Sequence, residues 1–291
     1  MNEGDCVSKN FWTQKANFGG GIRSDAVGFS IGNKGYVGTG LIHDYTMQDF
    51  WEYDPVLNVW TQKADFEGGA RSQAVGFSIG NKGYIGTGFN NNNQFQDFWE
   101  YDPISNSWTK KADFEGVARS QAVGFSIGSK GYVGTGWSGG VVTYQDFWEY
   151  DPDSNTWIQK ANVPGGNRGL AVSFSIGNKG YVGTGGNIND FWEYNPNSDT
   201  WVQIANIPHE GTASAVGFSI GNRGYVGTGY PWSRADFWEY NPVSDTWTQK
   251  ADFGGGGREA AIGFSIGNKG YVGTGWKTGD DIHQDFWEFT P

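Results

Sequence analysis

The sequence predicts an all-β protein built from six similar units that close into a ring. Gly-Phe-Ser-Ile-Gly, or its variant beginning at Ser173, occurs six times, and Asp-Phe-Trp-Glu recurs at intervals of 44 to 49 residues. The 48 glycines and 17% aromatic residues suit many short strands joined by tight turns. A repeat of this length is typical of arrays in which each unit buries its faces against its neighbours.

One unit contains four predicted strands, A to D. Residues 23–31 alternate small with larger side chains, which predicts strand A, and residues 32–35 are typical of a tight hairpin turn. Strands B, C and D follow at residues 36–40, 49–53 and 60–66. An Asp-Pro turn with a following Asn separates C from D. No segment predicts a helix.

Six sets of four antiparallel strands predict a six-bladed β-propeller. Residues 11–18 match strand D with no A to C before them, and the chain ends on a strand C at 285–289 with no D after it. We therefore expect residues 11–18 to be the outer strand of the last blade, which closes the ring and removes exposed edges. The expected organisation is a polar tail, 1–10, and a single propeller domain, 11–291.

The repeated sequence resembles the kelch repeat, and the resemblance covers residues 11–291. The resemblance lies in Gly-Tyr-(Val/Ile)-Gly-Thr-Gly, in the Tyr before Asp-Pro or Asn-Pro, and in the Trp at a fixed distance beyond it. Thr39-Gly40 stands where the family usually has Gly-Gly, which bears on the subfamily rather than the fold. The Gly-Thr-Gly and Asp-Phe-Trp-Glu-Tyr sequences are similar to those of bacterial kelch proteins, which are often found at the cell surface. One expectation is therefore a secreted or cell-surface protein whose signal peptide has been removed.

Composition narrows the classes of partner. The formal net charge is −11 and no basic run is present, which argues against nucleic acid. The single cysteine, Cys6, cannot form an intrachain disulfide, and no apolar run is long enough to predict a membrane span. The three histidines fall in different blades, and we expect neither a metal site nor a cofactor. We expect a monomer.

Length variation is confined to one loop of each unit. Eleven positions always separate the strand-D Trp from the residue that opens strand A, whereas the B-to-C loops differ in length from blade to blade. Antiparallel strands place the D-to-A and B-to-C loops on the same face, and insertions confined to one face often mark a binding surface.

The candidate ligand-binding residues lie in these two loops. In peptide-binding kelch proteins, the resemblance implies contacts from the residue that opens strand A and from the residue after the strand-B glycine. The candidates are Arg23, Arg71, Arg119, Arg168, Arg258, Phe89, Trp137, Tyr230, Trp232 and Trp276. A mouth of guanidinium groups with aromatic walls would suit a glycan or an acidic peptide or protein segment, bound without chemistry.

Three alternatives stay open. The arginines could be structural, because the Glu of each strand C needs a buried partner that either Arg or the Lys of Gln-Lys-Ala could supply. The chain could be a sugar-ring isomerase resembling the sialic acid mutarotase, itself a six-bladed kelch propeller, with Asp25 or Glu259 as acid or base. The near-identity of the copies also fits a designed or recently duplicated scaffold with no evolved ligand.

Overall fold

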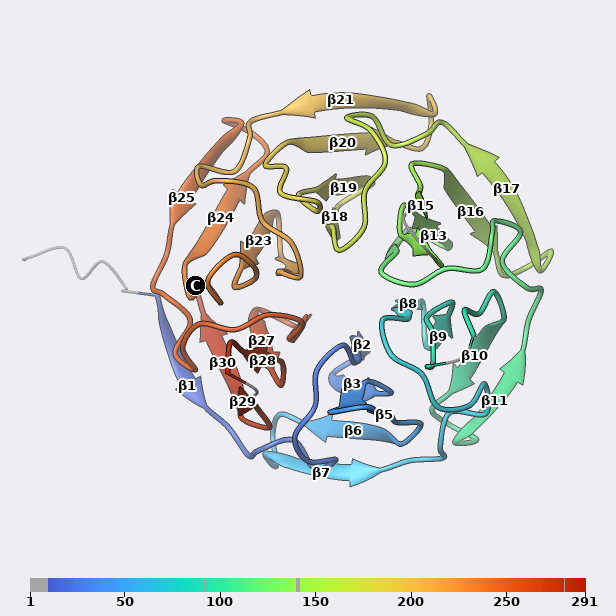
Figure 1. Ribbon diagram of the computed structural model, residues 1–291, viewed down its shortest axis with the longest axis vertical. Coiled ribbons are helices and arrows are strands. Elements are labelled where there is room, and N and C mark those ends of the chain that lie inside the picture. Colours follow the sequence, from blue (N-terminus) through green and yellow to red (C-terminus); the bar gives the residue numbers. More distant parts are fainter. Residues whose placement is uncertain (1–9, 92, 140–141, 280) are drawn as a thin grey trace, which may run out of the picture.

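The structure is a computed structural model that describes residues 10–91, 93–139, 142–279 and 281–291, and within them it contains strands and turns but no helix. Six four-stranded antiparallel sheets surround a central axis, as Figure 1 shows. This arrangement confirms the predicted six-bladed β-propeller. Of the predicted polar tail, residues 1–9 lie outside the described residues.

Each blade runs from an inner strand at the axis to an outer strand at the rim. Blade 1 consists of β2 (Val27–Ile31), β3 (Lys34–Gly38), β6 (Phe50–Asp54) and β7 (Val59–Gln62). Blade 2 consists of β8 (Val75–Ile79), β9 (Lys82–Gly86), β10 (Phe98–Asp102) and β11 (Ser107–Lys110). Blade 3 consists of β12 (Val123–Ile127), β13 (Lys130–Gly134), β16 (Phe147–Asp151) and β17 (Thr156–Lys160).

The second half of the ring repeats this order. Blade 4 consists of β18 (Val172–Ile176), β19 (Lys179–Gly183), β20 (Phe191–Asn195) and β21 (Thr200–Ile204). Blade 5 consists of β22 (Val216–Ile220), β23 (Arg223–Gly227), β24 (Phe237–Asn241) and β25 (Thr246–Gln249). Blade 6 consists of β26 (Ile262–Ile266), β27 (Lys269–Gly273), β30 (Phe286–Thr290) and, from the start of the chain, β1 (Phe11–Gln14).

The two ends of the chain close the ring. β1 pairs antiparallel with β30, in the register Phe11↔Thr290 to Gln14↔Trp287. Trp12 Nε1 donates to the Ala251 carbonyl oxygen at 3.1 Å, a contact that the strand-D tryptophans of the other blades make with the blade before them. The closing blade therefore meets its neighbour through the same contacts as every other blade.

The core is divided into six apolar clusters, each shared by adjacent blades. Between blades 1 and 2, Phe50 packs edge-on against Tyr101 and Trp108, with ring centroids 4.9 Å and 5.0 Å apart. In the inner strand of blade 1, Val27, Phe29 and Ile31 are buried in this packing, while the small residues between them line the axial channel. A Cβ at Gly28 would lie 3.0 Å from that of Ile262, so the small residues let the inner strands approach closely.

The strands are shorter than predicted at the loop-bearing edge. β2 begins at Val27 rather than at residue 23, and β3 ends at Gly38 rather than at residue 40. Asp25 has φ 55° and Thr39 has φ 59°, so the backbone leaves the extended conformation at these positions.

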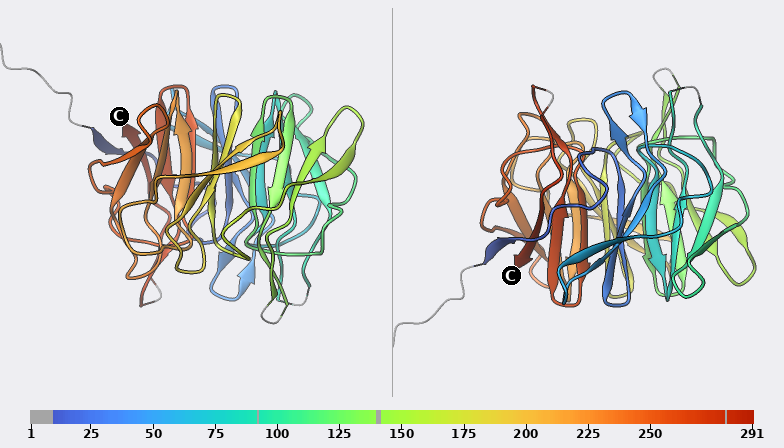
Figure 2. Two further views of the ribbon diagram at one scale, coloured as in Figure 1. Left: turned by 90° about the horizontal axis from the view of Figure 1, so that it is seen from above. Right: turned by 90° about the horizontal axis from the view of Figure 1, so that it is seen from below.

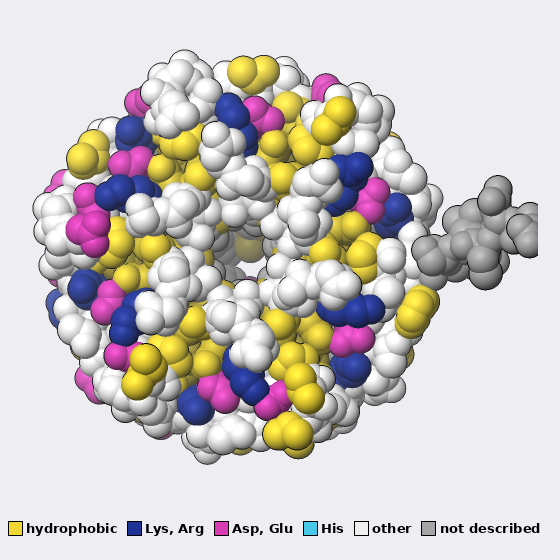
Figure 3. Space-filling model, turned by 180° about the vertical axis from the view of Figure 1, so that it is seen from behind, with side chains coloured by type: hydrophobic (Ala, Val, Ile, Leu, Met, Phe, Trp, Pro, Cys, Tyr) yellow, Lys and Arg dark blue, Asp and Glu magenta, His cyan; other side chains and the backbone are white. Residues whose placement is uncertain are grey.

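The two faces of the ring differ in kind. On the D-to-A and B-to-C side, Arg71 N donates to Met47 O at 3.1 Å, which confirms that the two sets of loops share a face, here called the loop face. Three hairpins project from it in Figure 2: β4 (Leu41–Ile42) with β5 (Tyr45–Thr46), β14 (Trp137–Ser138) with β15 (Val142–Thr143), and β28 (Trp276–Lys277) with β29 (Asp281–Ile282). The opposite face, in Figure 3, carries basic and acidic side chains around a central hollow. They include the pairs Lys82–Asp102 and Lys130–Asp151, both at 2.6 Å.

Candidate functional site

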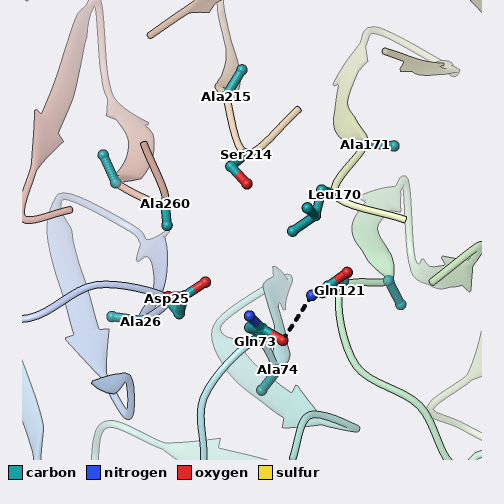
Figure 4. Close-up of a pocket in the computed structure, with 12 residues that line it drawn as sticks. Asp25, Ala26, Gln73, Ala74, Gln121, Leu170, Ala171, Ser214, Ala215 and Ala260 are labelled. Atoms are coloured by element: carbon teal, nitrogen blue, oxygen red, sulfur yellow. Dashed lines mark hydrogen bonds between the residues drawn. The ribbon is translucent and has the colours of Figure 1, made fainter. Parts of the chain in front are cut away.

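The axial channel opens on the loop face through a ring of six side chains, here called the mouth ring. The members lie two positions after the residue that opens strand A in each blade, and they line a cavity of about 180 Å³ together with the alanines that follow them (Figure 4). They are Asp25, Gln73, Gln121, Leu170, Ser214 and Ala260.

The backbone of the mouth ring is closed by hydrogen bonds between blades. The amide of each member donates to the carbonyl oxygen of the member in the preceding blade, at 2.9 to 3.2 Å, and Asp25 N completes the circle by donating to Ala260 O at 3.0 Å. All six residues have φ between 51° and 58°, a left-handed conformation that is uncommon outside glycine. Residues held in this region cluster at functional sites.

The mouth ring has a polar arc and an apolar arc. Asp25, Gln73 and Gln121 contribute a carboxyl and two amides, and Gln121 Nε2 donates to Gln73 Oε1 at 3.1 Å. Leu170 and Ala260 face them across the opening, with the hydroxyl of Ser214 between these two apolar side chains, as Figure 4 shows. Because the surrounding backbone is alike in all six blades, the differences around the ring lie in the side chains alone.

Burial raises the pKa of the Asp25 carboxyl above its ordinary value. Hydrogen bonds from Ser24 and Gln73 lower this pKa and the charge of Glu259 raises it, so the net shift is upward. A carboxyl group with a raised pKa can donate or accept a proton nearer to neutral pH than a solvated aspartate can.

The five predicted arginines do not form the mouth. Each guanidinium is buried against the Asp that opens Asp-Phe-Trp-Glu in its own blade; Arg71 Nη1 and Nη2, for example, donate to Asp97 Oδ1 and Oδ2 at 2.6 and 2.9 Å. The pairs are Arg23–Asp49, Arg71–Asp97, Arg119–Asp146, Arg168–Asp190 and Arg258–Asp285. Their role as ligand contacts stays a prediction, and this burial favours the structural alternative.

Further contacts hold each guanidinium in place. Arg71 Nη1 also donates to the Thr87 carbonyl oxygen at 2.9 Å, and its Cζ lies 4.0 Å from the centroid of the Phe95 ring. The equivalent distance from Arg119 to the Tyr144 ring is 4.3 Å. The charge and the terminal nitrogens of these arginines are therefore satisfied internally, whereas among the described residues Nε of Arg23 and Nε of Arg258 are buried without a hydrogen-bond partner.

The strand-C glutamates have other partners. Tyr36 Oη donates to Glu52 Oε2 at 2.7 Å, and Lys63 Nζ, from Gln-Lys-Ala, lies 3.3 Å from the same oxygen. The lysine, rather than the arginine, is therefore the charged partner of this carboxylate. Burial, followed by the hydrogen bond to Glu52, raises the pKa of the Tyr36 hydroxyl above its ordinary value, so it stays a donor.

The predicted loop aromatics surround the mouth ring at different levels of exposure. Phe89, Trp137 and Trp276 are half-buried, and each forms a β-bridge to the residue just before the mouth ring. Tyr230 is 48% exposed and Trp232 is 87% exposed, so these two rings present most surface to solvent. Trp276, with Leu41 and Asp25, lines a cavity of about 440 Å³ beside the ring, between blades 6 and 1.

Glu259, the other predicted acid or base, is buried and accepts a hydrogen bond from Ser233 Oγ at 3.1 Å. Within the described residues there is no group of three or more His, Cys, Asp or Glu side chains that could hold a metal ion. Nor is any helix of the described chain long and apolar enough to cross a membrane.

Of the six residues in the mouth ring, only Asp25 was identified from the sequence as a candidate functional residue. The signal of the ring is present, because Arg-Ser-X-Ala-Val and its variants hold X between nearly constant neighbours while X itself is Asp, Gln, Leu, Ser or Ala. A position that varies inside a constant repeat is a candidate contact by the same reasoning that singled out the B-to-C loops.

Comparison with known proteins supports the fold alone. No family model and no curated protein sequence matches the chain. Among solved structures, that described as "Structure of YjhT" is similar, with a TM-score of 0.79 and 17% identity over 94% of this chain and 95% of that one. At this identity the likeness establishes the propeller architecture and no further property.

Proposed function

We propose that this protein is a kelch-type propeller that recognises a glycan on its loop face without catalysing a reaction. The observation that carries the proposal is the mouth ring, where side chains of different chemistry meet in a concavity with one polar side, on an otherwise repetitive frame. Hydroxyl groups of a sugar would hydrogen-bond to the carboxyl and amides, and neighbouring aromatic faces would cover its apolar C–H surface.

An acidic peptide or protein segment is the second ligand that the aromatic loops could accept. Its binding would need cations, and the five arginines are buried in pairs with aspartates. A carboxylate would have to displace an internal partner to reach them, which leaves a buried charge uncompensated. The glycan is therefore the ligand that we favour.

The test is a glycan array and a peptide array, each probed with the wild-type chain and with Gln73→Ala/Gln121→Ala. We expect binding to one or more glycans that falls about tenfold or more when both amides are removed, as for central contacts of a binding site. Equal binding by the two proteins would contradict the role of the mouth ring. Peptide-only binding would reverse our preference between the two ligands.

A sugar-ring isomerase is a second candidate, favoured by the raised pKa of the Asp25 carboxyl. In such a reaction an acid protonates the ring oxygen while a base removes the proton of the anomeric hydroxyl. NMR exchange spectroscopy on sialic acid and on neutral hexoses would detect faster exchange between anomers with the wild-type chain than with Asp25→Asn. An exchange rate equal to that in buffer would rule the candidate out for these sugars.

A further inference from the structure

Blade 5 departs from the repeat at three positions that meet around one carboxylate, Asp236. Thr212 stands where the other five blades have the buried arginine, and His209 stands where they have the glycine of the D-to-A loop. Arg234, two residues before Asp236, replaces the apolar, aromatic or imidazole residue of the other blades. Changes at three separate points of the chain therefore converge on a single place.

The first two changes depend on each other sterically. A Cβ at Gly255 would lie 2.5 Å from Arg258 Nη2, its nearest neighbour, and one at Gly116 would lie 2.9 Å from Arg119 Nη2 and 2.5 Å from the Phe114 ring, so the buried arginine is one of the groups that exclude a side chain at the glycine position. Thr212 leaves that space, and His209 occupies it. The imidazole Nε2 lies 3.8 Å from Asp236 Oδ2.

The exchange brings the cation of this pair to the surface, while the carboxylate of Asp236 stays as exposed, at 18%, as the equivalent carboxylates of the other blades, at 13% to 21%. Asp236 Oδ1 accepts one hydrogen bond from Arg234 Nε at 3.0 Å, and Oδ2 accepts one from Trp238 Nε1 at 2.8 Å. The side chain of Arg234 is 25% exposed, whereas those of the five buried arginines are 0% exposed. In place of a two-pronged internal contact, blade 5 has a single-bonded pair that a ligand can reach.

This pair lines an open pocket of about 550 Å³ on the loop face, here called the blade-5 pocket. Its lining also includes His209, Gln249 and the highly exposed Trp232. Trp232 has φ 71° and Ser233 has φ 47°, and such a conformation is unfavourable for residues other than glycine, so it persists only where the surroundings enforce it. An aromatic residue held in this conformation and yet exposed has no evident packing role.

Contacts with blade 6 enforce the conformation of the Trp232 loop. Ser233 Oγ donates to the buried Glu259 at 3.1 Å and lies 3.3 Å from Thr278 Oγ1. A Cβ at Gly257 would overlap the Ser233 carbonyl oxygen, so the loop is seated closely against the next D-to-A segment. Glu259, an exception to its own repeat position, thus helps to hold the loop that presents the indole.

The charges of the pocket balance. The Arg234 guanidinium compensates the charge of the Asp236 carboxylate. Burial lowers the pKa of the His209 imidazole and outweighs the opposing effects of a backbone hydrogen bond and of Asp236, so this side chain is neutral at neutral pH. An indole face beside a compensated donor–acceptor pair matches a ring that has apolar C–H groups on one side and hydroxyls at its edge. A charged ligand would leave one charge without a partner.

We propose that the blade-5 pocket is a subsite for an uncharged sugar ring, which stacks on Trp232 and hydrogen-bonds to Arg234, Asp236 and Gln249. The inference rests on the glycan-binding function proposed above, and it specifies where one ring sits and that the ring carries no charge.

The test uses immobilised oligosaccharides that end in neutral hexoses or N-acetylhexosamines, beside matched ones that end in uronic acids. Five chains are compared: wild type, Trp232→Ala, the double variant His209→Gly/Thr212→Arg, the mouth-ring variant Gln73→Ala/Gln121→Ala, and Tyr45→Ala as a control. Tyr45 is a loop aromatic that is 76% exposed and lies in blade 1. The double variant restores the repeat, so that Asp236 is drawn into an internal pair and the variant is expected to fold.

We expect neutral ends to bind wild type and Tyr45→Ala alike, and to bind Trp232→Ala and the double variant about tenfold or more weakly. Neutral binding that is unchanged in Trp232→Ala but lost in Gln73→Ala/Gln121→Ala would overturn the blade-5 subsite and leave the proposed function standing. Binding of uronic acid ends alone would overturn the charge argument and with it the subsite. Absence of binding to every glycan would overturn both proposals.

Discussion

Blades 2 and 5 share one backbone plan and handle the same carboxylate in opposite ways. In blade 2, Asp97 is fastened to Arg71 by two hydrogen bonds, and the guanidinium is fully buried. In blade 5, Asp236 has a partly exposed arginine on one oxygen and a histidine near the other. The strands around the two aspartates are alike. The different partners of Asp97 and Asp236 therefore show which contacts of this aspartate the fold requires and which are free to serve a binding surface.

The comparison shows that the buried pair is one solution rather than a condition of folding. Blade 5 closes its sheet and packs its core without it. The carboxylate needs a partner and room for that partner's side chain. In five blades the partner is the arginine that opens strand A, and a glycine in the D-to-A loop leaves room for it. In blade 5 the partners come from the two loops, Arg234 from one and His209 from the other, and His209 takes the place of the glycine.

The largest effect is expected from Arg71→Thr, which gives blade 2 the blade-5 residue alone. Removing one member of a buried ion pair costs about 3–5 kcal/mol, because the carboxylate is left uncompensated. Urea denaturation followed by tryptophan fluorescence measures the free energy of unfolding. Arg223→Thr is the matched control, because Arg223 lies at the surface, 3.9 Å from Glu239, and such pairs contribute about 0–1 kcal/mol. Similar losses in the two variants would contradict the structural role of Arg71.

A smaller effect is expected when the whole blade-5 solution is placed in blade 2. Phe66→Ile/Gly68→His/Arg71→Thr/Phe95→Arg, which includes the blade-5 isoleucine, should recover about 0.5–3 kcal/mol of the loss, the range usual for residues that interact directly. Gly68→His by itself should destabilise, since a Cβ there would lie 2.4 Å from the Phe66 ring and 2.9 Å from Arg71 Nη2. Strict additivity of the separate losses in urea denaturation would show that these positions are not coupled.

The pH dependence of stability should differ between two carboxyl groups whose pKa values are shifted in opposite directions. Asp285 is in one of the buried arginine pairs, and Asp25 is in the mouth ring. Burial alone would raise the pKa of Asp285, but the hydrogen bonds and charge of Arg258 outweigh it and lower the pKa. Its contribution is therefore present above the unfolded-state pKa near 3.8 and is lost as pH falls through the lower folded-state value. Asp285→Asn should destabilise at pH 7 and progressively less in acid.

Asp25 should behave in the opposite sense. Its pKa is raised, so the folded chain binds the proton more tightly and loses stability as pH rises from about 3.8 through the folded-state value. Asp25→Asn should therefore stabilise at pH 7 and flatten the profile over this window. Thermal unfolding across a pH series measures both variants, and a destabilising Asp25→Asn at pH 7 would contradict the assigned direction.

The smallest effect is expected from His209→Gly/Thr212→Arg, which makes blade 5 like the others. Asp236 already has partners, so the gain should be only about 0.5–2 kcal/mol, as is usual for consensus substitutions. Thermal unfolding would show a small rise in Tm, and a fall would mean that the blade-5 arrangement is the more stable one.

The fold was predictable because the same pattern of strands and turns occurs six times in the sequence. The unmatched strands at 11–18 and 285–289 indicated how the ring closes. The partner of the arginines was not predictable, because the Asp and the Glu of Asp-Phe-Trp-Glu recur together. In the structure Asp49 lies just before β6 and pairs with Arg23 at the loop edge, whereas Glu52 lies within β6 and pairs with Lys63. The mouth ring was missed for a related reason, since a residue within a predicted strand gives no sign that its backbone turns left-handed toward the axis.

The amide-to-carbonyl circle at the channel mouth has an evolutionary consequence. The six bonds of this circle join main-chain atoms, and the same geometry already accepts carboxyl, amide, hydroxyl and hydrocarbon side chains. A point mutation in one blade could therefore change what the opening selects and leave the joint between neighbouring blades intact. A lineage of such proteins could diversify its specificity one blade at a time.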